Sequence, residues 1–180
     1  MTAIHPADII AFWQSVGYDK WYGKDDAFDA EIRRRFGAIH ADAVEGKLEH
    51  WALTAQGALA LLILLDQFSR NLYRGDARAF AGDAVARTVA DAAIAEGFDH
   101  QVDPVLRQFF YLPFEHSERM EDQDRSVTLF TALGGKTLPY AIEHRDIIAR
   151  FGRFPHRNAV LGRTTTPEEQ AFLDGGGFKG

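Results

Sequence analysis

Three clusters of polar side chains carry the residue types that could do chemistry. The first contains Asp66, Gln67, Arg70, Asn71 and Arg74; the second contains Glu115, His116 and Glu118; the third contains Arg150, Arg153, His156, Arg157, Asn158 and Arg163. Arginine binds carboxylates and phosphates through two parallel hydrogen bonds. A carboxylate beside a histidine can transfer protons as an acid and a base. The clusters therefore indicate either a binding site for an anion or an acid–base site.

The third cluster is strongly basic within an acidic chain. From His144 to Arg163 there are five arginines and one acid, Asp146, whereas the whole chain has a formal net charge of −6. We predict a pocket that joins the clusters and binds a small anionic ligand or the acidic end of a peptide. Its expected ligand-binding residues are Asp66, Arg70, Asn71, Arg74, Arg153, His156, Arg157 and Asn158. Because the net charge is negative, we expect neither nucleic acid nor a membrane surface as a partner.

The same residues have a purely structural interpretation. Arginines of the third cluster could pair with Asp66, Glu115 and Glu118, and their remaining donors could bind carbonyl groups of the loop. A loop without regular structure needs such partners for its backbone. A buried ion-pair network is often no more stable than an apolar replacement, however, so a concentration of ion pairs also favours a site.

An enzyme is the other functional interpretation, with Glu115, His116 and Glu118 as the expected catalytic residues. Metal assistance could come from His116, His144 and His156 with Glu115, Glu118 or Asp66 as ligands. The chain has no H-E-x-x-H motif, and His144 lies on an apolar stripe, which is typical of a core histidine. We therefore assign no metal ligands, and the cofactor is unknown. Phosphate-binding glycine loops and the G-x-S-x-G motif are absent.

The elements that position these clusters centre on residues 59–75, LALLILLDQFSRNLYRG. This stretch begins as a fully apolar run and turns polar at Asp66 without a helix breaker. A helix that is apolar on all sides is a buried helix. We predict a helix over about 55–74, capped by Thr54, that carries polar groups directly out of the core.

Helical spacing of apolar residues recurs along most of the chain. The expected helices cover about 6–17, 26–46, 55–74, 79–96, a segment from Pro104, 121–133, 138–151 and 167–173, with a loop at 151–163. Asp25 or Asp26 and Thr166 are the expected caps of the second and last helices. No segment alternates as a strand does. We predict an all-α fold of about seven helices, as a single compact domain over 1–174 with a flexible glycine-rich tail at 175–180.

Composition limits the class of protein. The chain has 180 residues, of which 46% are apolar and 12% aromatic, and it has no cysteine. These values are typical of a globular protein, and the absence of cysteine suits a reducing compartment. We find neither a secretory signal at the start nor an apolar run long enough to span a membrane. The expected location is the cytoplasm, and the oligomeric state is unknown.

Three motifs together resemble one family. DQFSRNLYRG at 66–75, YLPFEHSE at 111–118 and RFGRFPHRNAVLGR at 150–163 occur in the order and spacing of the bacterial family of unknown function DUF924. The resemblance covers nearly the whole chain. It implies a TPR-like fold of helices stacked in pairs, and it implies no established activity. A TPR-like fold is itself a poor guide to function.

Three functions follow as hypotheses. The first, which we favour from the sequence, is a protein that binds a small anion or an acidic peptide end. The second is a hydrolase that uses the Glu/His pair, with or without a metal. The third is an adaptor for other proteins, in which the polar motifs are structural and exposed aromatic residues such as Trp13, Trp21 and Trp51 bind a partner.

Overall fold

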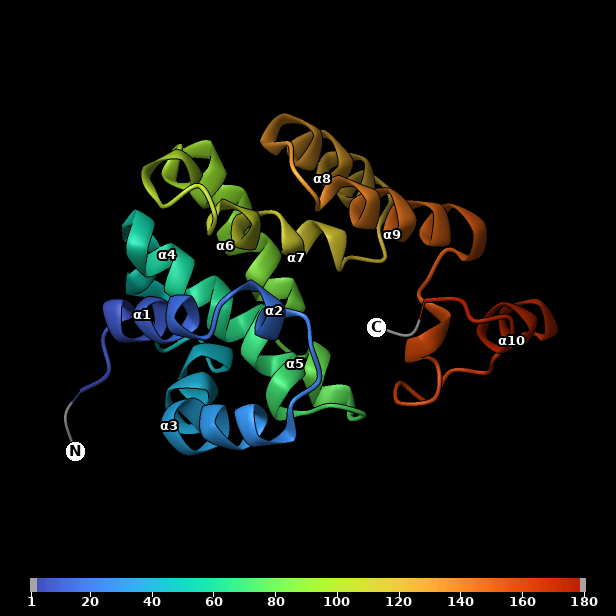
Figure 1. The fold of residues 1–180 in the computed structure, drawn as a ribbon, viewed down its shortest axis with the longest axis horizontal. Coiled ribbons are helices and arrows are strands. Elements are labelled where there is room, and N and C mark those ends of the chain that lie inside the picture. The colour runs from blue at the N-terminus through green and yellow to red at the C-terminus, as the bar shows by residue number, and fades with distance from the viewer. Residues whose placement is uncertain (1–2, 179–180) are drawn as a thin grey trace. The chain divides into compact units, whose positions relative to one another are not determined.

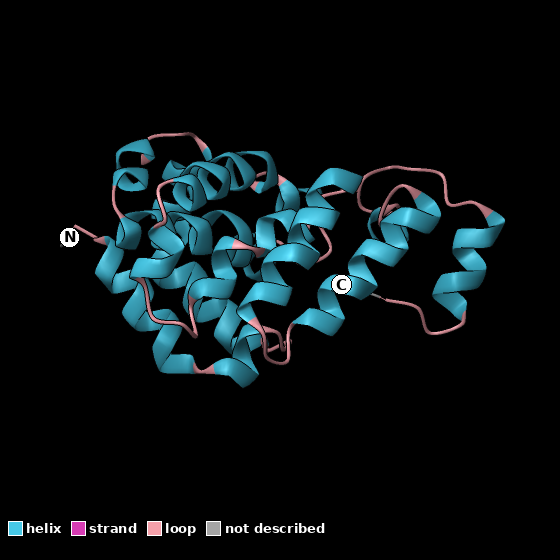
Figure 2. Cartoon of the chain, turned by 90° about the horizontal axis from the view of Figure 1, so that it is seen from above, coloured by secondary structure: helices cyan, strands magenta, loops and turns pink. Residues whose placement is uncertain are grey.

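The computed structural model describes residues 3–178, and these residues form helices and loops without a strand (Figure 2). The predicted all-α class is confirmed. Contacts divide the chain into two compact units. Unit 1 contains the chain up to Arg74 together with Arg78–Pro113, and unit 2 contains Gly75–Ala77 and the chain from Phe114 onward. The predictions of a single domain and of TPR-like stacking stay predictions.

Unit 1 is built around one buried helix, as the apolar run predicts. α4 (Ala55–Leu62) continues into a π-helical segment (Ile63–Phe68) and then into α5 (Ser69–Leu72). Every residue from Ala58 to Leu65 is at most 2% exposed. Thr54 caps α4 as predicted, because its side chain accepts a hydrogen bond from the Gly57 amide at 3.1 Å.

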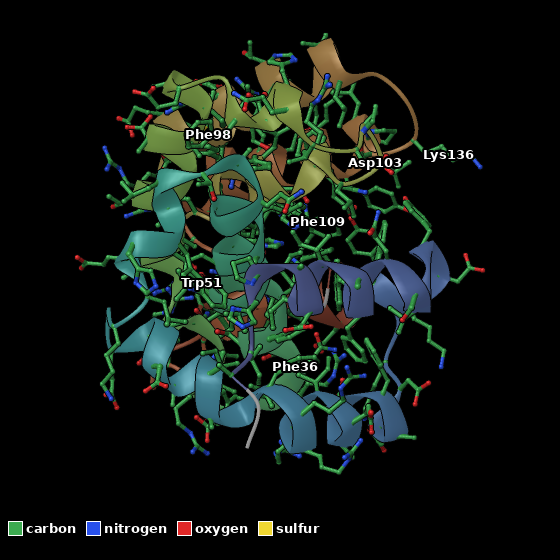
Figure 3. All side chains as sticks on the ribbon, turned by 90° about the vertical axis from the view of Figure 1, so that its left-hand side faces the viewer. Phe36, Trp51, Phe98, Asp103, Phe109 and Lys136 are labelled. Carbon is green, nitrogen blue, oxygen red and sulfur yellow. The ribbon has the colours of Figure 1, made fainter. Side chains whose placement is uncertain are left out.

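Aromatic rings fill the space around this helix. α1 (Pro6–Val16), α2 (Tyr18–Trp21) and α3 (Asp26–Val44) supply most of them, and a 3₁₀ segment (Arg107–Phe110) supplies Phe109. Phe12 of α1 contacts Phe36 of α3 at a centroid distance of 4.9 Å, and the Phe36 side chain lies on the side of α3 that faces α1 (Figure 3). All three tryptophans, Trp13, Trp21 and Trp51, are buried in this unit. The exposed aromatic surface that an adaptor would use therefore does not come from these residues.

Two predicted helices of unit 1 differ in the structure. α6 (Asp83–Ala95) begins four residues later than expected, after a 3₁₀ segment (Ala77–Phe80). No α-helix begins at Pro104, where the structure has turns and the 3₁₀ segment Arg107–Phe110 before α7 (Leu112–Glu115). Phe109, Phe110, Tyr111 and Leu112 are all buried. The backbone here closes i→i+3 hydrogen bonds, from the Leu106 amide to the Asp103 carbonyl at 2.8 Å and from the Phe109 amide to the Leu106 carbonyl at 3.1 Å, rather than the i→i+4 bonds of an α-helix. The prediction of an α-helix there was wrong.

Unit 2 contains a helix pair followed by an irregular segment. α7 (Leu112–Glu115) is a single turn in which the chain passes from unit 1 to unit 2. α8 (Met120–Leu133) and α9 (Leu138–Phe151) are joined by a short loop and lie side by side (Figure 1). A 3₁₀ turn (Pro155–Arg157) interrupts the predicted loop, and α10 (Pro167–Asp174) begins after the predicted capping residue Thr166. Within residues 3–178, no helix has both the length and the apolar character needed to cross a membrane.

Candidate acid–base and metal centre

Glu115, His116 and His144 come together in unit 2. One possible ligand atom of each residue lies within 4.8 Å of those of the other two. Glu115 and His144 are buried, whereas His116 is half-buried and reaches solvent. Glu115 ends α7, His116 follows it directly, and α9 supplies His144. Two imidazoles and a carboxylate are ligands that zinc and similar transition metals prefer.

His144 is held as a neutral imidazole. Burial and, secondarily, the neighbouring His116 lower the pKa of His144 to about 3, although the Tyr140 carbonyl opposes this shift. Its Nδ1 lies 2.8 Å from that carbonyl oxygen. A carbonyl can only accept, so Nδ1 carries the hydrogen and the lone pair is on Nε2. Coordination through Nε2 would keep this hydrogen bond, which is the usual arrangement for a metal-binding histidine.

Glu115 faces this ring, because its Oε1 lies 3.6 Å from His144 Nδ1. The contact joins a carboxylate to a neutral ring, since His144 does not carry a charge near pH 7. A Glu/His pair of this kind can also transfer a proton without a metal. The geometry thus supports both the acid–base and the metal interpretation of these residues.

Gln123 of α8 holds the backbone on both sides of His116. Its Nε2 donates to the carbonyl oxygens of Glu115 and Ser117 at 2.7 and 2.6 Å. The Gln123 side chain is fully buried. This amide side chain from a neighbouring helix, together with the hydrogen bond from the Ser117 amide to the Phe114 carbonyl at 3.1 Å, holds the turn that carries both candidate ligands.

Glu118 connects this turn to the segment after α9. Its carboxylate accepts hydrogen bonds from Arg163 at 2.7 and 3.0 Å and from the Phe154 amide at 2.8 Å. Burial alone would raise the pKa of Glu118, but the Arg163 and Phe154 hydrogen bonds outweigh this effect and lower it. Glu118 therefore remains ionised and bound to partners, which suits a structural role better than the catalytic role that the sequence suggested.

Phe154 is the ring around which the third cluster is arranged. It is fully buried and contacts the rings of His144 and His156 at centroid distances of 5.4 and 5.6 Å. The Arg157 guanidinium lies 4.4 Å from the centroid of the same ring and is buried. His156 and Arg157 are therefore next to the candidate centre.

Arg153 and Asn158 bind a carboxylate of the protein itself. Arg153 donates to both oxygens of Glu169 at 2.6 and 2.8 Å, and Asn158 donates to Glu169 at 3.1 Å. The Arg153 hydrogen bonds are the main cause that lowers the pKa of Glu169 to about 2. Glu169 also completes the predicted capping box with Thr166. These two expected anion ligands thus serve the start of α10.

The first cluster lies in unit 1 and has its own acidic partners there. Arg70 lies 2.9 Å from Asp66 and 3.1 Å from Asp83. Arg74 and Asn71 both donate to Asp29, at 2.5 and 2.7 Å. Each arginine of this cluster is therefore paired with carboxylates, which is what the structural interpretation requires.

Comparison with known proteins agrees with the resemblance seen in the motifs. The family model described as bacterial protein of unknown function (DUF924) matches residues 9–177. The chain belongs to the DUF924 family.

A solved structure is also similar to this DUF924 chain. It is described as a protein of unknown function from Agrobacterium tumefaciens, is 50% identical, and has a TM-score of 0.92. The similarity covers 94% of this chain and 97% of the other. The comparison with curated proteins gave no match. The family thus establishes the fold and assigns no activity, so the function must be argued from the site.

The sequence predicts Glu115 and His116 as site residues, whereas His144 is weighed as a metal ligand and interpreted as a core histidine. Its apolar stripe is real, because Ile147 and Ile148 on the same helix are buried. What the sequence could not show is that α9 turns this stripe toward the Glu115–His116 turn. The role of Gln123 was also missed, since a glutamine within a helix carries no local signal.

Proposed function

We propose that this protein binds a divalent transition-metal ion at Glu115, His116 and His144, and that the bound ion supports a hydrolytic reaction. The observation that carries this proposal is the convergence of the three ligand atoms within 4.8 Å. Two histidines and a glutamate leave coordination positions open for water and substrate, as in catalytic zinc sites. A metal ion in such a site can polarise a substrate oxygen and activate water.

The protonation state of His144 supports the proposal. A metal binds imidazole only in its neutral form, and burial keeps the pKa of His144 at about 3. The half-buried His116 gives the ion a side from which solvent and substrate can approach. The absence of cysteine fits a reducing compartment, and we place the protein in the cytoplasm as part of this proposal.

The geometry ranks this function above the anion-binding pocket. Arg70, Arg74 and Arg153, three of the expected anion ligands, are each within 3 Å of a carboxylate oxygen of the protein. An external anion would have to displace these partners. The adaptor hypothesis gains no specific support, because the three tryptophans are buried.

The test is a titration of untagged, chelator-treated protein with Zn²⁺ in a calorimeter. We expect one zinc per chain for the wild type, and binding at least about 100-fold weaker in His116→Ala, since removal of even an outer partner typically costs 10–100-fold. His116 is the best choice because it is only half-buried. His100→Ala is the matched control, since the His100 side chain is 69% exposed and lies in unit 1. Wild-type protein that binds no zinc, or a His116 variant that binds it normally, would refute the metal site.

Activity follows as a second measurement. Zinc-loaded protein is tested against nitrophenyl esters and phosphates, and turnover should be lost in His116→Ala but kept in His100→Ala. Turnover that is equal in both variants would come from a contaminant or from another site. If the protein binds zinc but turns over none of these esters and phosphates, the metal site stands and the hydrolytic reaction is refuted.

A further inference from the structure

The glycine-rich segment after α10 folds back onto the end of that helix. The Gly175 amide donates to the Ala171 carbonyl at 3.0 Å, and the Gly177 amide donates to the Phe172 carbonyl at 3.0 Å. Gly176 has a φ of +83°, a conformation that favours glycine. The described part of the predicted flexible tail, Gly175–Phe178, is therefore a hydrogen-bonded turn, and residues 179–180 lie outside the described residues.

Gly177 must be a glycine for this turn to close. A Cβ atom at this position would lie 2.6 Å from the Phe172 ring and 2.6 Å from the Phe172 carbonyl oxygen. Contacts this short do not occur in proteins, so any side chain would push the segment away from Phe172. The close approach of Gly177 thus determines where the next residue, Phe178, is placed.

Phe178 lies directly against the candidate metal centre. Its ring centroid is 4.5 Å from that of His144 and 5.2 Å from that of His156. Phe154 contacts the same two imidazoles from its buried position. His144 is therefore enclosed by two phenyl rings, of which Phe154 belongs to the core and Phe178 is only half-buried and carried by the turn.

We propose that the segment Gly175–Phe178 is a cover on the metal centre, with Phe178 as the residue that closes access to His144. This inference rests on the proposed function, because it assigns a regulated access to that same site. A phenyl ring against the imidazole excludes water from the ligand and must move before a chelator or an incoming ion reaches it. Glycines at three successive positions, Gly175 to Gly177, let the backbone make that movement at low cost.

The first experiment measures how fast zinc is lost. Zinc-loaded protein is mixed with an excess of a chromogenic chelator in a stopped-flow instrument. We expect the rate to rise at least tenfold in Phe178→Ala and also in Gly177→Ala, which keeps the phenyl ring but displaces it. Phe151→Ala is the matched control, because Phe151 packs in the same apolar cluster and contacts Phe172 rather than a histidine.

A second experiment needs no metal. Diethyl pyrocarbonate modifies neutral imidazoles, and peptide mass spectrometry gives the rate for each histidine. In metal-free protein we expect His144 to react at least tenfold faster in Phe178→Ala than in the wild type, with His100 unchanged. Faster modification of His144 together with no zinc binding would keep the cover and refute the metal site. If His144 is modified at the wild-type rate in both Phe178→Ala and Gly177→Ala, the cover is refuted, whether or not zinc binds.

Discussion

Arginine–carboxylate pairs account for half of the polar residues in the three clusters. Arg74 with Asp29, Arg153 with Glu169, and Arg163 with Glu118 each join segments far apart in the chain. The sequence shows that arginines and acids are numerous, but it cannot show which acid each arginine will meet. That choice is made by tertiary packing, which is why anion binding and a structural network could not be separated from the sequence alone.

Glu169 predicts a specific dependence of stability on pH. Its pKa is about 2 in the folded protein, below the ordinary value of 4.5. A carboxylate with a lowered pKa stabilises the fold fully above its unfolded-state pKa, and this contribution is lost as the pH falls from about 4.5 to about 2. We expect urea unfolding to show wild type more stable than Glu169→Gln at pH 7, with the difference shrinking at pH 4 and 3.

The control for this experiment is Glu168→Gln. Glu168 pairs with Arg150 at 3.1 Å, but its side chain is 67% exposed. Exposed pairs of this kind contribute less than about 1 kcal/mol. A difference between wild type and Glu169→Gln that stays constant from pH 7 to pH 3 would show that the carboxylate charge does not provide the stabilisation.

At the scale of elements, we predict opposite effects on stability for alanine substitutions at two glycines of unit 1. A Cβ atom on Gly82, just before α6, would lie 2.4 Å from the Leu65 carbonyl oxygen, whereas one on Gly37 in α3 would meet nothing within 4 Å. We expect Gly82→Ala to destabilise the protein by about 1–3 kcal/mol, as overpacking does. Gly37→Ala should stabilise it by up to about 1 kcal/mol, because alanine is the better helix former.

Chemical unfolding of the two variants beside the wild type checks this prediction. Gly37→Ala also serves as the control for the effect of an added methyl group. Equal effects of the two substitutions would mean that α6 can move away from the π-helical segment without loss. A stabilised Gly82→Ala would contradict the close packing at Leu65.

Elements were predicted well wherever the signal is local. The caps Asp25, Thr54 and Thr166 bind the amides that their sequence positions indicate. The conformation was not predicted for segments that depend on contacts with the rest of the molecule. The π-helical segment within the central helix has no sequence signature of its own, and the segment from Pro104 forms turns and a 3₁₀ segment in place of the expected α-helix.

For the whole molecule, metal binding should be visible as stability. An ion that binds only the folded state adds about 2.7 kcal/mol at a free concentration of 100 times its dissociation constant. All three tryptophans lie in unit 1, so tryptophan fluorescence reports on that unit alone, whereas far-ultraviolet circular dichroism reports on helices of both units. We expect both signals to give one transition, and zinc to raise its midpoint in the wild type but not in His116→Ala.

The reason to expect one transition is that α7 contains residues of both units and is a single hydrogen-bonded turn. The sequence also shows no linker. Two separate midpoints, with zinc moving only the one seen by circular dichroism, would instead divide the chain into two domains. A midpoint that zinc does not move, at concentrations that saturate binding, would mean that the ion binds the unfolded chain equally well.

The π-helical segment Ile63–Phe68 lets the central helix hold one extra residue without changing the direction of the side chains that follow it. Each residue of an α-helix turns the chain by about 100°, and a π turn accommodates one residue more than an α turn. A chain shortened by one residue here could continue as a regular helix. Its later side chains would keep the same rotational phase, because the residue lost is the extra one that the π turn absorbs, and Asn71 and Arg74 would still face Asp29. A residue lost from a regular turn of α4 would instead rotate them by about 100°. The hydrogen bonds of the first polar cluster therefore tolerate a one-residue deletion in this segment but not in α4.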